Sequence, residues 1–203
     1  NVQMWDDEDR FFYDVLRLPR GGGTRLKVSS MLGMLPLRPA TVVMSRAREV
    51  APEVVARAAW FVERRPRLVE NMHDPRKPGY RDRRLLAILG EDRLRRVLGH
   101  MLDENEFLSP FGIRSLSAKH RGQPYEFWAG GQSFSVNYLP AESDTGMFGG
   151  NSNWRGPIWM PVNGLIIRAL VHYFAYYGND FQVECPTGSG RWLRSAARRV
   201  GKA

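Results

Sequence analysis

The hydrophobic and polar positions of the chain follow a helical period in three segments. Residues 50–65 carry apolar side chains at helical spacing, with a proline near their start and Pro66 directly after them. Residues 157–178 are the longest apolar segment and end at a glycine. In residues 91–102 one apolar stripe repeats every three or four positions and consists of Leu94, Val97, Leu98, Met101 and Leu102. The pattern predicts a helix in each segment.

Two further segments follow other patterns. Residues 29–44 are apolar but contain Pro36 and Pro39, which predicts a short or broken helix. Residues 125–139 place two adjacent glycines between aromatic-rich runs, which predicts a β-hairpin. Because helical segments dominate, the expected fold class is mainly α with a small β-hairpin insertion.

The composition is that of a globular domain. Of the 203 residues, 43% are hydrophobic and 11% aromatic, which is too apolar for a disordered chain. No run approaches the roughly eighteen apolar residues of a transmembrane helix, and the acidic start of the chain is unlike a signal peptide. The single cysteine excludes an internal disulfide framework and favours a reducing, cytoplasmic location. The four histidines lack metal-ligand spacing, so no metal site is expected.

The net charge of +9 is distributed locally. Residues 45–100 and 191–203 are net basic, whereas the first fifteen residues are net acidic. This pattern gives no continuous stripe that could follow a phosphate backbone, so nucleic-acid binding is the weakest functional interpretation. It would depend on the basic side chains of Arg64, Arg65, Arg67, Arg76, Lys77, Arg81, Arg83 and Arg84.

The segment 142–159 is the most informative for function. Its glycines allow the backbone to approach a ligand closely. Trp154 and Trp159 offer flat apolar faces, and Asn153 and Arg155 offer directional hydrogen bonds. A sugar ring needs both, because its C–H faces stack while its hydroxyls donate and accept. The segment therefore predicts a carbohydrate site, and a well-packed entry to a helix is the alternative.

Carboxylates could supply the acid and base of a hydrolase, but the sequence does not show which of them would pair. The candidates form three groups, which are Asp6, Asp7, Glu8 and Asp9; Asp103, Glu104 and Glu106; and Glu142 and Asp144.

Five stretches of the sequence together resemble one family. They are residues 5–14 (WDDEDRFFYD), 26–37 (LKVSSMLGMLPL), 106–117 (EFLSPFGIRSLS), 140–159 (PAESDTGMFGGNSNWRGPIW) and 176–190 (YYGNDFQVECPTGSG). The resemblance is to the catalytic domain of glycoside hydrolase family 63, which includes processing α-glucosidase (mannosyl-oligosaccharide glucosidase) and bacterial relatives. The NWRGPIW run within the fourth stretch is the most specific part.

The resemblance implies that residues 1–190 are part of a six-hairpin (α/α) toroid, with 191–203 as a basic tail that does not match. It also implies inverting hydrolysis of α-glycosidic bonds in oligosaccharides or small glucosides, without a cofactor. Residues that would line the sugar pocket are Trp154, Arg155 and Trp159, with Asn153 and Phe148 beside them and Trp5 and Asp6 flanking the same pocket.

In this family the general acid precedes the segment that matches Trp5, and the general base follows the segment that matches Gly190. We therefore expect an internal fragment of the enzyme that supplies pocket walls and carries no catalytic residue itself. A carbohydrate-binding remnant without turnover is the alternative. The expected partner is a carbohydrate substrate rather than a nucleic acid or a membrane.

Overall fold

Short strands and helices alternate along the chain. The computed structural model describes residues 3–19, 21–44, 46–140 and 158–193. The strands are β1 (Trp5–Asp6), β2 (Phe11–Phe12), β3 (Asp14–Arg17), β4 (Gly23–Leu26), β5 (Ala40–Val43), β6 (Arg84–Ala87), β7 (Leu108–Ser109), β8 (Gly112–Ile113), β9 (Tyr125–Ala129), β10 (Gln132–Val136), β11 (Val183–Glu184) and β12 (Trp192–Leu193). The helices are the 3-10 helices η1 (Met31–Leu37), η2 (Tyr80–Asp82) and η3 (Ala118–His120), and the α-helices α1 (Ala47–Val50), α2 (Pro52–Arg64), α3 (Pro66–Val69), α4 (Glu91–Met101) and α5 (Met160–Tyr177).

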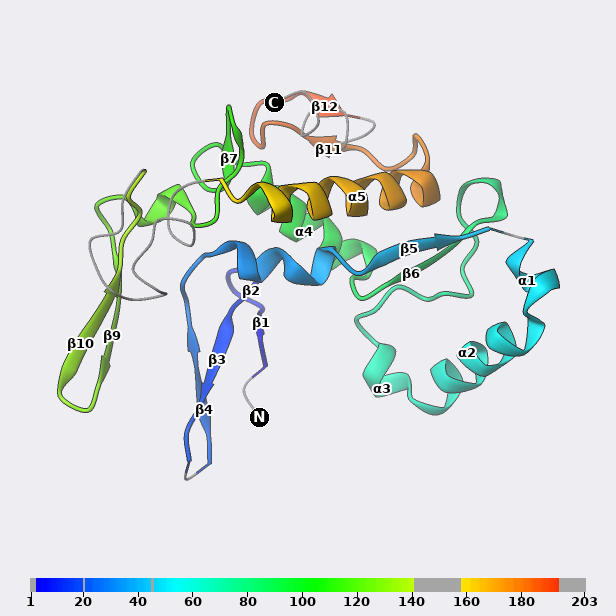
Figure 1. Ribbon diagram of the computed structural model, residues 1–203, viewed down its shortest axis with the longest axis horizontal. Coiled ribbons are helices and arrows are strands. Elements are labelled where there is room, and N and C mark those ends of the chain that lie inside the picture. Colours follow the sequence, from blue (N-terminus) through cyan, green and yellow to red (C-terminus); the bar gives the residue numbers. More distant parts are fainter. Residues whose placement is uncertain (1–2, 20, 45, 141–157, 194–203) are drawn as a thin grey trace.

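In the part of the chain that is described, the strands form separate antiparallel pairs. Most pairs are hairpins of neighbouring strands, such as β3–β4 and β9–β10. The pair β5–β6 differs, because α1, α2 and α3 lie between its strands in the sequence. Figure 1 shows the resulting elongated shape, in which these three helices extend from one end and the hairpin β9–β10 from the other.

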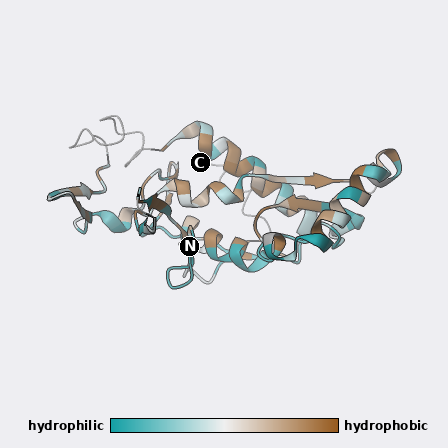
Figure 2. Ribbon diagram, turned by 90° about the horizontal axis from the view of Figure 1, so that it is seen from below, coloured by the Kyte–Doolittle hydropathy of each residue, from teal (hydrophilic) through white to brown (hydrophobic). Residues whose placement is uncertain are grey.

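The core lies between α5, α4, η1 and the ribbon β5–β6, which run together through the middle of the molecule (Figure 1). Helix α5 packs along β5, and His172 accepts a hydrogen bond at Nδ1 from the backbone N–H of Val42 at 3.3 Å. In Figure 2, hydrophobic residues recur along α5 and the ribbon, while hydrophilic residues interrupt them more often on α2. The completely buried side chains include Phe11, Met31, Met34, Leu37, Leu85, Leu94, Met101, Phe107 and Tyr176.

The three predicted helices are confirmed. Helix α4 buries Leu94, Val97, Leu98 and Met101, and it carries Glu91 and Asp92 in its first turn, where the helix dipole favours negative charge. Helix α2 begins at Pro52 and ends before Pro66, and none of its side chains is buried. Helix α5 runs from Met160 to Tyr177 and is followed by Gly178, whose φ of 67° suits a glycine. None of the helices in the described ranges is long and apolar enough to cross a membrane.

The expected fold class is wrong. The structure is mixed α/β, and its described residues do not form an (α/α) toroid. The β-hairpin predicted at 125–139 is present as β9–β10, but the other strand pairs were not expected. Strands of two to five residues are too short to show a period of two in the sequence. Gly21 and Gly22, both with positive φ, lie in the turn that pairs β3 with β4.

Candidate functional site

The predicted sugar-binding residues fall into two groups in the structure. Phe148, Asn153, Trp154 and Arg155 lie outside the described residues. The described residues are Trp5 and Asp6 on β1 and Trp159 at the start of α5. These described residues lie on two different elements, the β1–β2 hairpin and the entry to α5, and no hydrogen bond or ring contact joins Trp5 or Asp6 to Trp159.

Asp6 is a buried carboxylate with a partner at each oxygen. Its Oδ1 accepts the backbone N–H groups of Glu8 at 3.1 Å and Asp9 at 3.0 Å, which closes the turn between β1 and β2. Its Oδ2 accepts a hydrogen bond from Nη1 of Arg25 at 2.8 Å and lies 3.2 Å from Nζ of Lys27. The carboxylate thus joins the β1–β2 turn to strand β4 and the residue after it.

These contacts keep Asp6 ionised. The hydrogen bond from the backbone of Asp9 lowers the pKa of Asp6; burial opposes it, and Lys27 and Arg25 lower the pKa further. The net effect is a pKa below the usual 3.8. A general acid needs the opposite, a carboxyl that still carries its proton at working pH. The chemistry of Asp6 is therefore that of a fixed negative charge that orders its surroundings.

Trp5 is buried beside Asp6, with 7% of its surface exposed. Its indole Nε1 donates to Oδ1 of Asp7 at 2.9 Å, and its ring meets Phe12 edge-on at 4.7 Å between centroids. The guanidinium of Arg93 on α4 lies 4.6 Å from the ring centroid, a cation–π contact. In this arrangement the indole packs β1 against α4.

His100 connects α4 to the same turn. Its Nε2 lies 2.9 Å from the carbonyl oxygen of Asp9, which can only accept, so Nε2 carries a proton. Its Nδ1 lies 2.9 Å from Oε1 of Glu106 and donates to that carboxylate when the ring is protonated. Burial lowers the pKa of His100, but the hydrogen bond and charge of Glu106 outweigh it and raise the pKa above 6.5.

The other carboxyl oxygen of Glu106, Oε2, is buried and has no hydrogen-bond partner among the described residues. Because His100 contacts both Asp9 and Glu106, it holds the β1–β2 turn to the segment that follows α4.

No group of three or more histidine, cysteine, aspartate or glutamate side chains within the described ranges could hold a metal ion.

At the entry to α5, Trp159 is the residue before the first helical turn. It is partly buried against the core. Its carbonyl oxygen accepts the backbone N–H groups of Val162 and Asn163, both at 3.1 Å. The side-chain Nδ2 of Asn163 also donates to this oxygen at 3.1 Å. The backbone of Trp159 is therefore held firmly where segment 142–159 ends.

Asn163 also bonds to a neighbouring strand. Its Oδ1 accepts the N–H of Ile113 on β8 at 2.7 Å, and its Nδ2 donates to the carbonyl of Ile113 at 3.1 Å. Directly before the helix, Ile158 forms an isolated antiparallel bridge with Arg114. The hairpin β7–β8 and the entry to α5 thus form one hydrogen-bonded unit.

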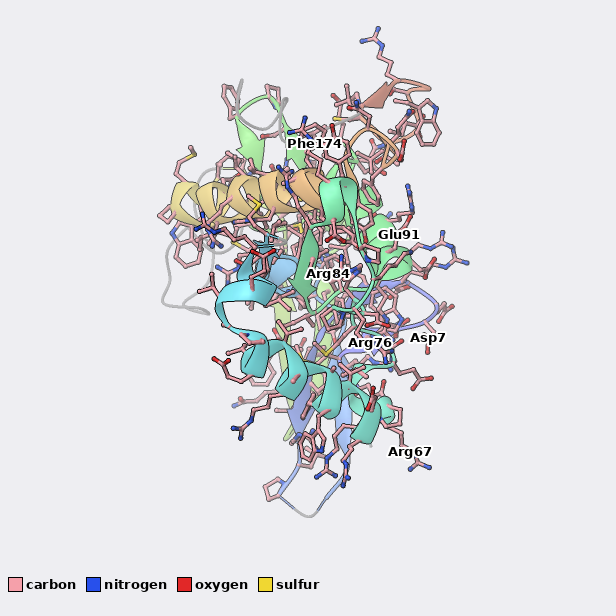
Figure 3. All side chains as sticks on the ribbon, turned by 90° about the vertical axis from the view of Figure 1, so that its right-hand side faces the viewer. Asp7, Arg67, Arg76, Arg84, Glu91 and Phe174 are labelled. Atoms are coloured by element: carbon pink, nitrogen blue, oxygen red, sulfur yellow. The ribbon has the colours of Figure 1, made fainter. Side chains whose placement is uncertain are left out.

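Two arginines on or near β6 are paired with carboxylates. Arg76 pairs with Asp74 at 2.9 Å, and Arg84 pairs with Asp82 at 2.8 Å. Arg83 donates to the carbonyl of Ala175 at 2.8 Å. Figure 3 shows Arg67, Arg76 and Arg84 well separated on this side of the molecule. The two ion pairs offset the charges of Arg76 and Arg84, and the bond to Ala175 occupies the guanidinium of Arg83, within the basic set on which a nucleic-acid interface would depend.

The match to a known family covers most of the second half of the chain. The model of the glycosyl hydrolase family 63 C-terminal domain matches residues 84–185, which is half of the chain and runs from β6 through α4 and α5 to β11. The chain belongs to glycosyl hydrolase family 63. The family predicted from the sequence is confirmed.

A second comparison extends beyond that region. The family 63 chain is 43% identical over 194 residues to the uncharacterized protein YMR196W of Saccharomyces cerevisiae. The alignment covers 95% of this chain and 18% of the yeast protein. The chain thus spans less than a fifth of the length of that relative.

Two positions that organise the site were missed at the sequence level. Asn163 is a polar residue inside the apolar segment of α5, and this break in the pattern is the available signal. A buried amide needs partners, so it could have been expected to bond outside its helix. His100 gave no such signal, because its partners Asp9 and Glu106 lie on segments whose proximity only the fold establishes.

Proposed function

We propose that this chain forms walls of the sugar pocket in an inverting α-glycosidase of the α-glucosidase type, acting on oligosaccharides or small glucosides. The observation that carries the proposal is the family 63 match across residues 84–185, which includes the segment 142–159 with its two tryptophans and its arginine. In this proposal Trp154, Arg155 and Trp159 contact the ring that is cleaved off, with Asn153 and Phe148 beside them. Trp5 and Asp6 flank the pocket.

The entry to α5 supports this role by the way it holds its backbone. Substrate-positioning groups act best on rigid elements, because small displacements weaken the oriented contacts that bring reacting atoms together. Asn163 fixes the carbonyl of Trp159 and the backbone of Ile113 at once. The indole that would stack on the sugar is therefore attached to a hydrogen-bonded support.

The carboxylates of the β1–β2 turn support a positioning role as well. Asp6 is ionised, and both of its oxygens already have partners. It therefore neither protonates a leaving group nor activates water; the proposal leaves both steps to carboxylates elsewhere in the complete enzyme. Asp6 orders the turn that carries Trp5.

The test is a steady-state assay of the full-length protein that contains this chain, with a chromogenic α-glucoside and with glucose release from an α-linked disaccharide. Trp159→Ala should lower kcat/KM by about a hundredfold or more, because stacking area and orientation are lost together. Trp128→Ala is the matched control, since Trp128 is 69% exposed on β9 and is given no role. Unchanged turnover in Trp159→Ala with a normal unfolding midpoint would contradict the proposal.

A second candidate is carbohydrate binding without hydrolysis. It uses the same aromatic segment 142–159 and needs neither a general acid nor a general base from this chain. Calorimetric titration of the full-length protein with glucosides separates the two candidates. Saturable binding without release of reducing sugar supports the second; release of the β-anomer from an α-glucoside, seen by NMR, supports inverting hydrolysis.

A further inference from the structure

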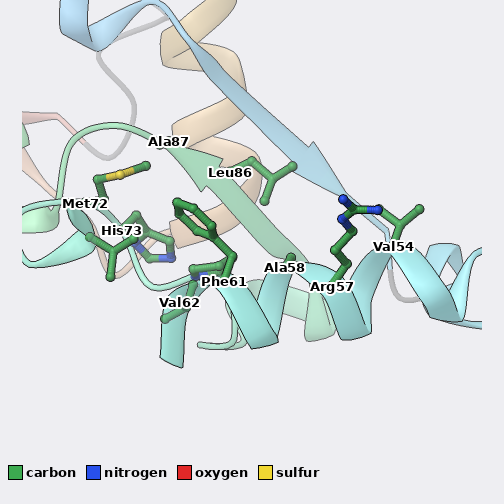
Figure 4. A pocket seen from close by; sticks show the side chains of 11 residues that line it. Val54, Arg57, Ala58, Phe61, Val62, Met72, His73, Leu86 and Ala87 are labelled. Carbon is green, nitrogen blue, oxygen red and sulfur yellow. The ribbon is translucent and has the colours of Figure 1, made fainter. Parts of the chain in front are cut away.

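A cavity of about 440 Å³, open to solvent, lies between helix α2 and strand β6, and none of the described residues of the expected sugar site lines it. Its volume falls within the range of about 300–1,000 Å³ that small-molecule sites occupy. The walls are mainly apolar and include Phe61, Met72 and Leu86, with Arg57 and His73 as the polar members. Figure 4 shows the side chains of α2 facing β6 across this space.

His73 is the buried polar group of the cavity. It is 7% exposed, and its Nε2 has no hydrogen-bond partner among the described residues. Its ring contacts Tyr176 edge-on at 4.7 Å between centroids, and Figure 4 shows it directed from its loop toward Phe61. An unpaired polar atom in an apolar site normally lowers stability. A ligand atom that forms a hydrogen bond with it would remove that cost.

The protonation of His73 limits what that partner can be. Burial lowers the pKa of His73, and nearby Lys77 lowers it further against the opposing charges of Asp74 and Glu91. The ring is therefore neutral at physiological pH, and Nε2 either donates or accepts according to the tautomer. A hydroxyl group suits both tautomers, because it can do either.

Arg57 supplies charge at the other end. It is exposed on α2 and forms no ion pair with a described residue. In the view of Figure 4, Arg57 and Val54 stand at one end of the cavity, and His73, Phe61 and Met72 gather at the other. Exposed apolar walls around one buried and one charged polar group are the usual construction of a site for an amphipathic small molecule.

We propose that this cavity binds a small aromatic hydroxy acid, with its hydroxyl on Nε2 of His73, its ring between Phe61, Met72 and Leu86, and its carboxylate at Arg57. The aromatic body fills the apolar space that helix α2 leaves over β6. The hydroxyl gives Nε2 the partner that it lacks in the structure. The guanidinium of Arg57 selects an anion over a neutral analogue.

The experiment is calorimetric titration of the full-length protein that contains this chain with para-hydroxyphenylpropionate. Phenylpropionate, which lacks the hydroxyl, should bind about fivefold more weakly, the worth of one hydrogen bond to a neutral buried group. Hydroxyphenylpropanol, which lacks the charge, should also bind about two- to fivefold more weakly, and this loss should disappear in high salt.

Two variants locate the site. His73→Phe should abolish the preference for the hydroxylated acid, while Arg57→Gln should abolish the preference for the acid over the alcohol. Arg67→Gln on α3 makes the same charge change outside the cavity and should alter neither preference. Because Arg57 is exposed, its substitution tests the proposal even if His73→Phe fails to fold.

Three results would overturn the proposal. One is the absence of saturable binding to the unsubstituted protein. A second is equal affinity for the hydroxylated and plain acids, or equal effects of Arg57→Gln and Arg67→Gln. The third is a dimer in sedimentation velocity that excludes the probe, which would assign the cavity to a second copy of the chain. A glucoside should not displace the probe, since Trp5, Asp6 and Trp159 do not line this cavity.

Discussion

Asn163 and Ile113 exchange two hydrogen bonds across the interior. The N–H of Ile113 donates to Oδ1 of Asn163 at 2.7 Å, and Nδ2 of Asn163 donates to the carbonyl of Ile113 at 3.1 Å. The side chain of Asn163 thus pairs with both the N–H and the C=O of Ile113, as a neighbouring strand would at the edge of β8. This pair connects α5 to β8.

Replacing Asn163 tests how much that connection contributes. Asn163→Leu keeps the size of the side chain but leaves the N–H and C=O of Ile113 buried without partners, each at a cost of about 1–3 kcal/mol. We expect the free energy of unfolding to fall by about 2–3 kcal/mol, measured by urea denaturation. Asn105→Leu, at an exposed position, should change it by less than about 0.5 kcal/mol. Equal losses in both variants would show that the pair contributes nothing.

Gly112 lies against the same amide. Its φ is 129°, and an added Cβ would lie 3.0 Å from Oδ1 of Asn163 and 3.1 Å from Cγ2 of Ile158. Gly122 also has positive φ, 70°, but a Cβ there would meet nothing within 4 Å. Alanine at either position adds backbone strain, but only Gly112→Ala also crowds the pair. We expect Gly112→Ala to cost about 1–2 kcal/mol more than Gly122→Ala in thermal unfolding, and a smaller cost would contradict the tight contact.

The elements that sequence analysis predicted are those whose stabilising contacts repeat within one segment. The stripe of Leu94, Val97, Leu98 and Met101 has helical spacing, and these residues are buried in α4 as expected. The ribbon β5–β6 was missed because its strands pair across residues 44–83, so neither strand shows its partner locally. The toroid was expected through the resemblance rather than from such a pattern.

The same distinction applies to the site. The helix itself follows from the sequence, but it was expected to begin at 157, whereas it begins at Met160 and leaves Trp159 before its first turn. The support beneath Trp159 does not follow from the sequence, because Ile113 is distant from Asn163 in the chain and meets it only in the folded core. The roles of Phe148, Asn153, Trp154 and Arg155 in sugar binding stay predictions, since these residues lie outside the described part of the structure.

Because of Asp6, the free energy of unfolding should fall as the solution becomes acidic. Because the pKa of Asp6 in the folded chain lies below the usual 3.8, its contribution is fully present above that value and is lost as pH falls through the lowered pKa. Asp6→Asn removes the charge that Arg25 and Lys27 share. We expect a loss of about 1–3 kcal/mol at neutral pH, measured by urea denaturation, and a smaller loss below pH 3.8.

The matched control for this substitution is Asp180→Asn, at an exposed position after α5. It makes the same chemical change away from the β1–β2 turn. At each pH, its free energy of unfolding should be nearly equal to that of the unsubstituted chain. If the loss in Asp6→Asn were the same at acid and neutral pH, the charge of Asp6 would not be the stabilising feature.

For His100 we expect the contribution to the free energy of unfolding to change with pH in the opposite direction. The folded pKa of His100 is raised above its unfolded value of 6.5, because Glu106 and the carbonyl of Asp9 outweigh burial. Its contribution is therefore fully present below 6.5 and is lost as pH rises through the raised pKa. His73, His120 and His172 have lowered pKa values and act in the other direction.

The comparison of the unsubstituted chain with His100→Gln isolates the contribution of His100 to stability, because the other histidines are common to both. Glutamine can still donate to the carbonyl of Asp9 but gains no charge beside Glu106. We expect the difference in the free energy of unfolding to be largest below pH 6.5 and to shrink by up to about 1.4 kcal/mol per pH unit above it, until the folded pKa is passed. Urea midpoints at intervals from acid to alkaline pH measure it. A difference that grows with pH would mean that His100 is neutral in the folded chain and that the proton shared with Glu106 does not hold the β1–β2 turn to α4.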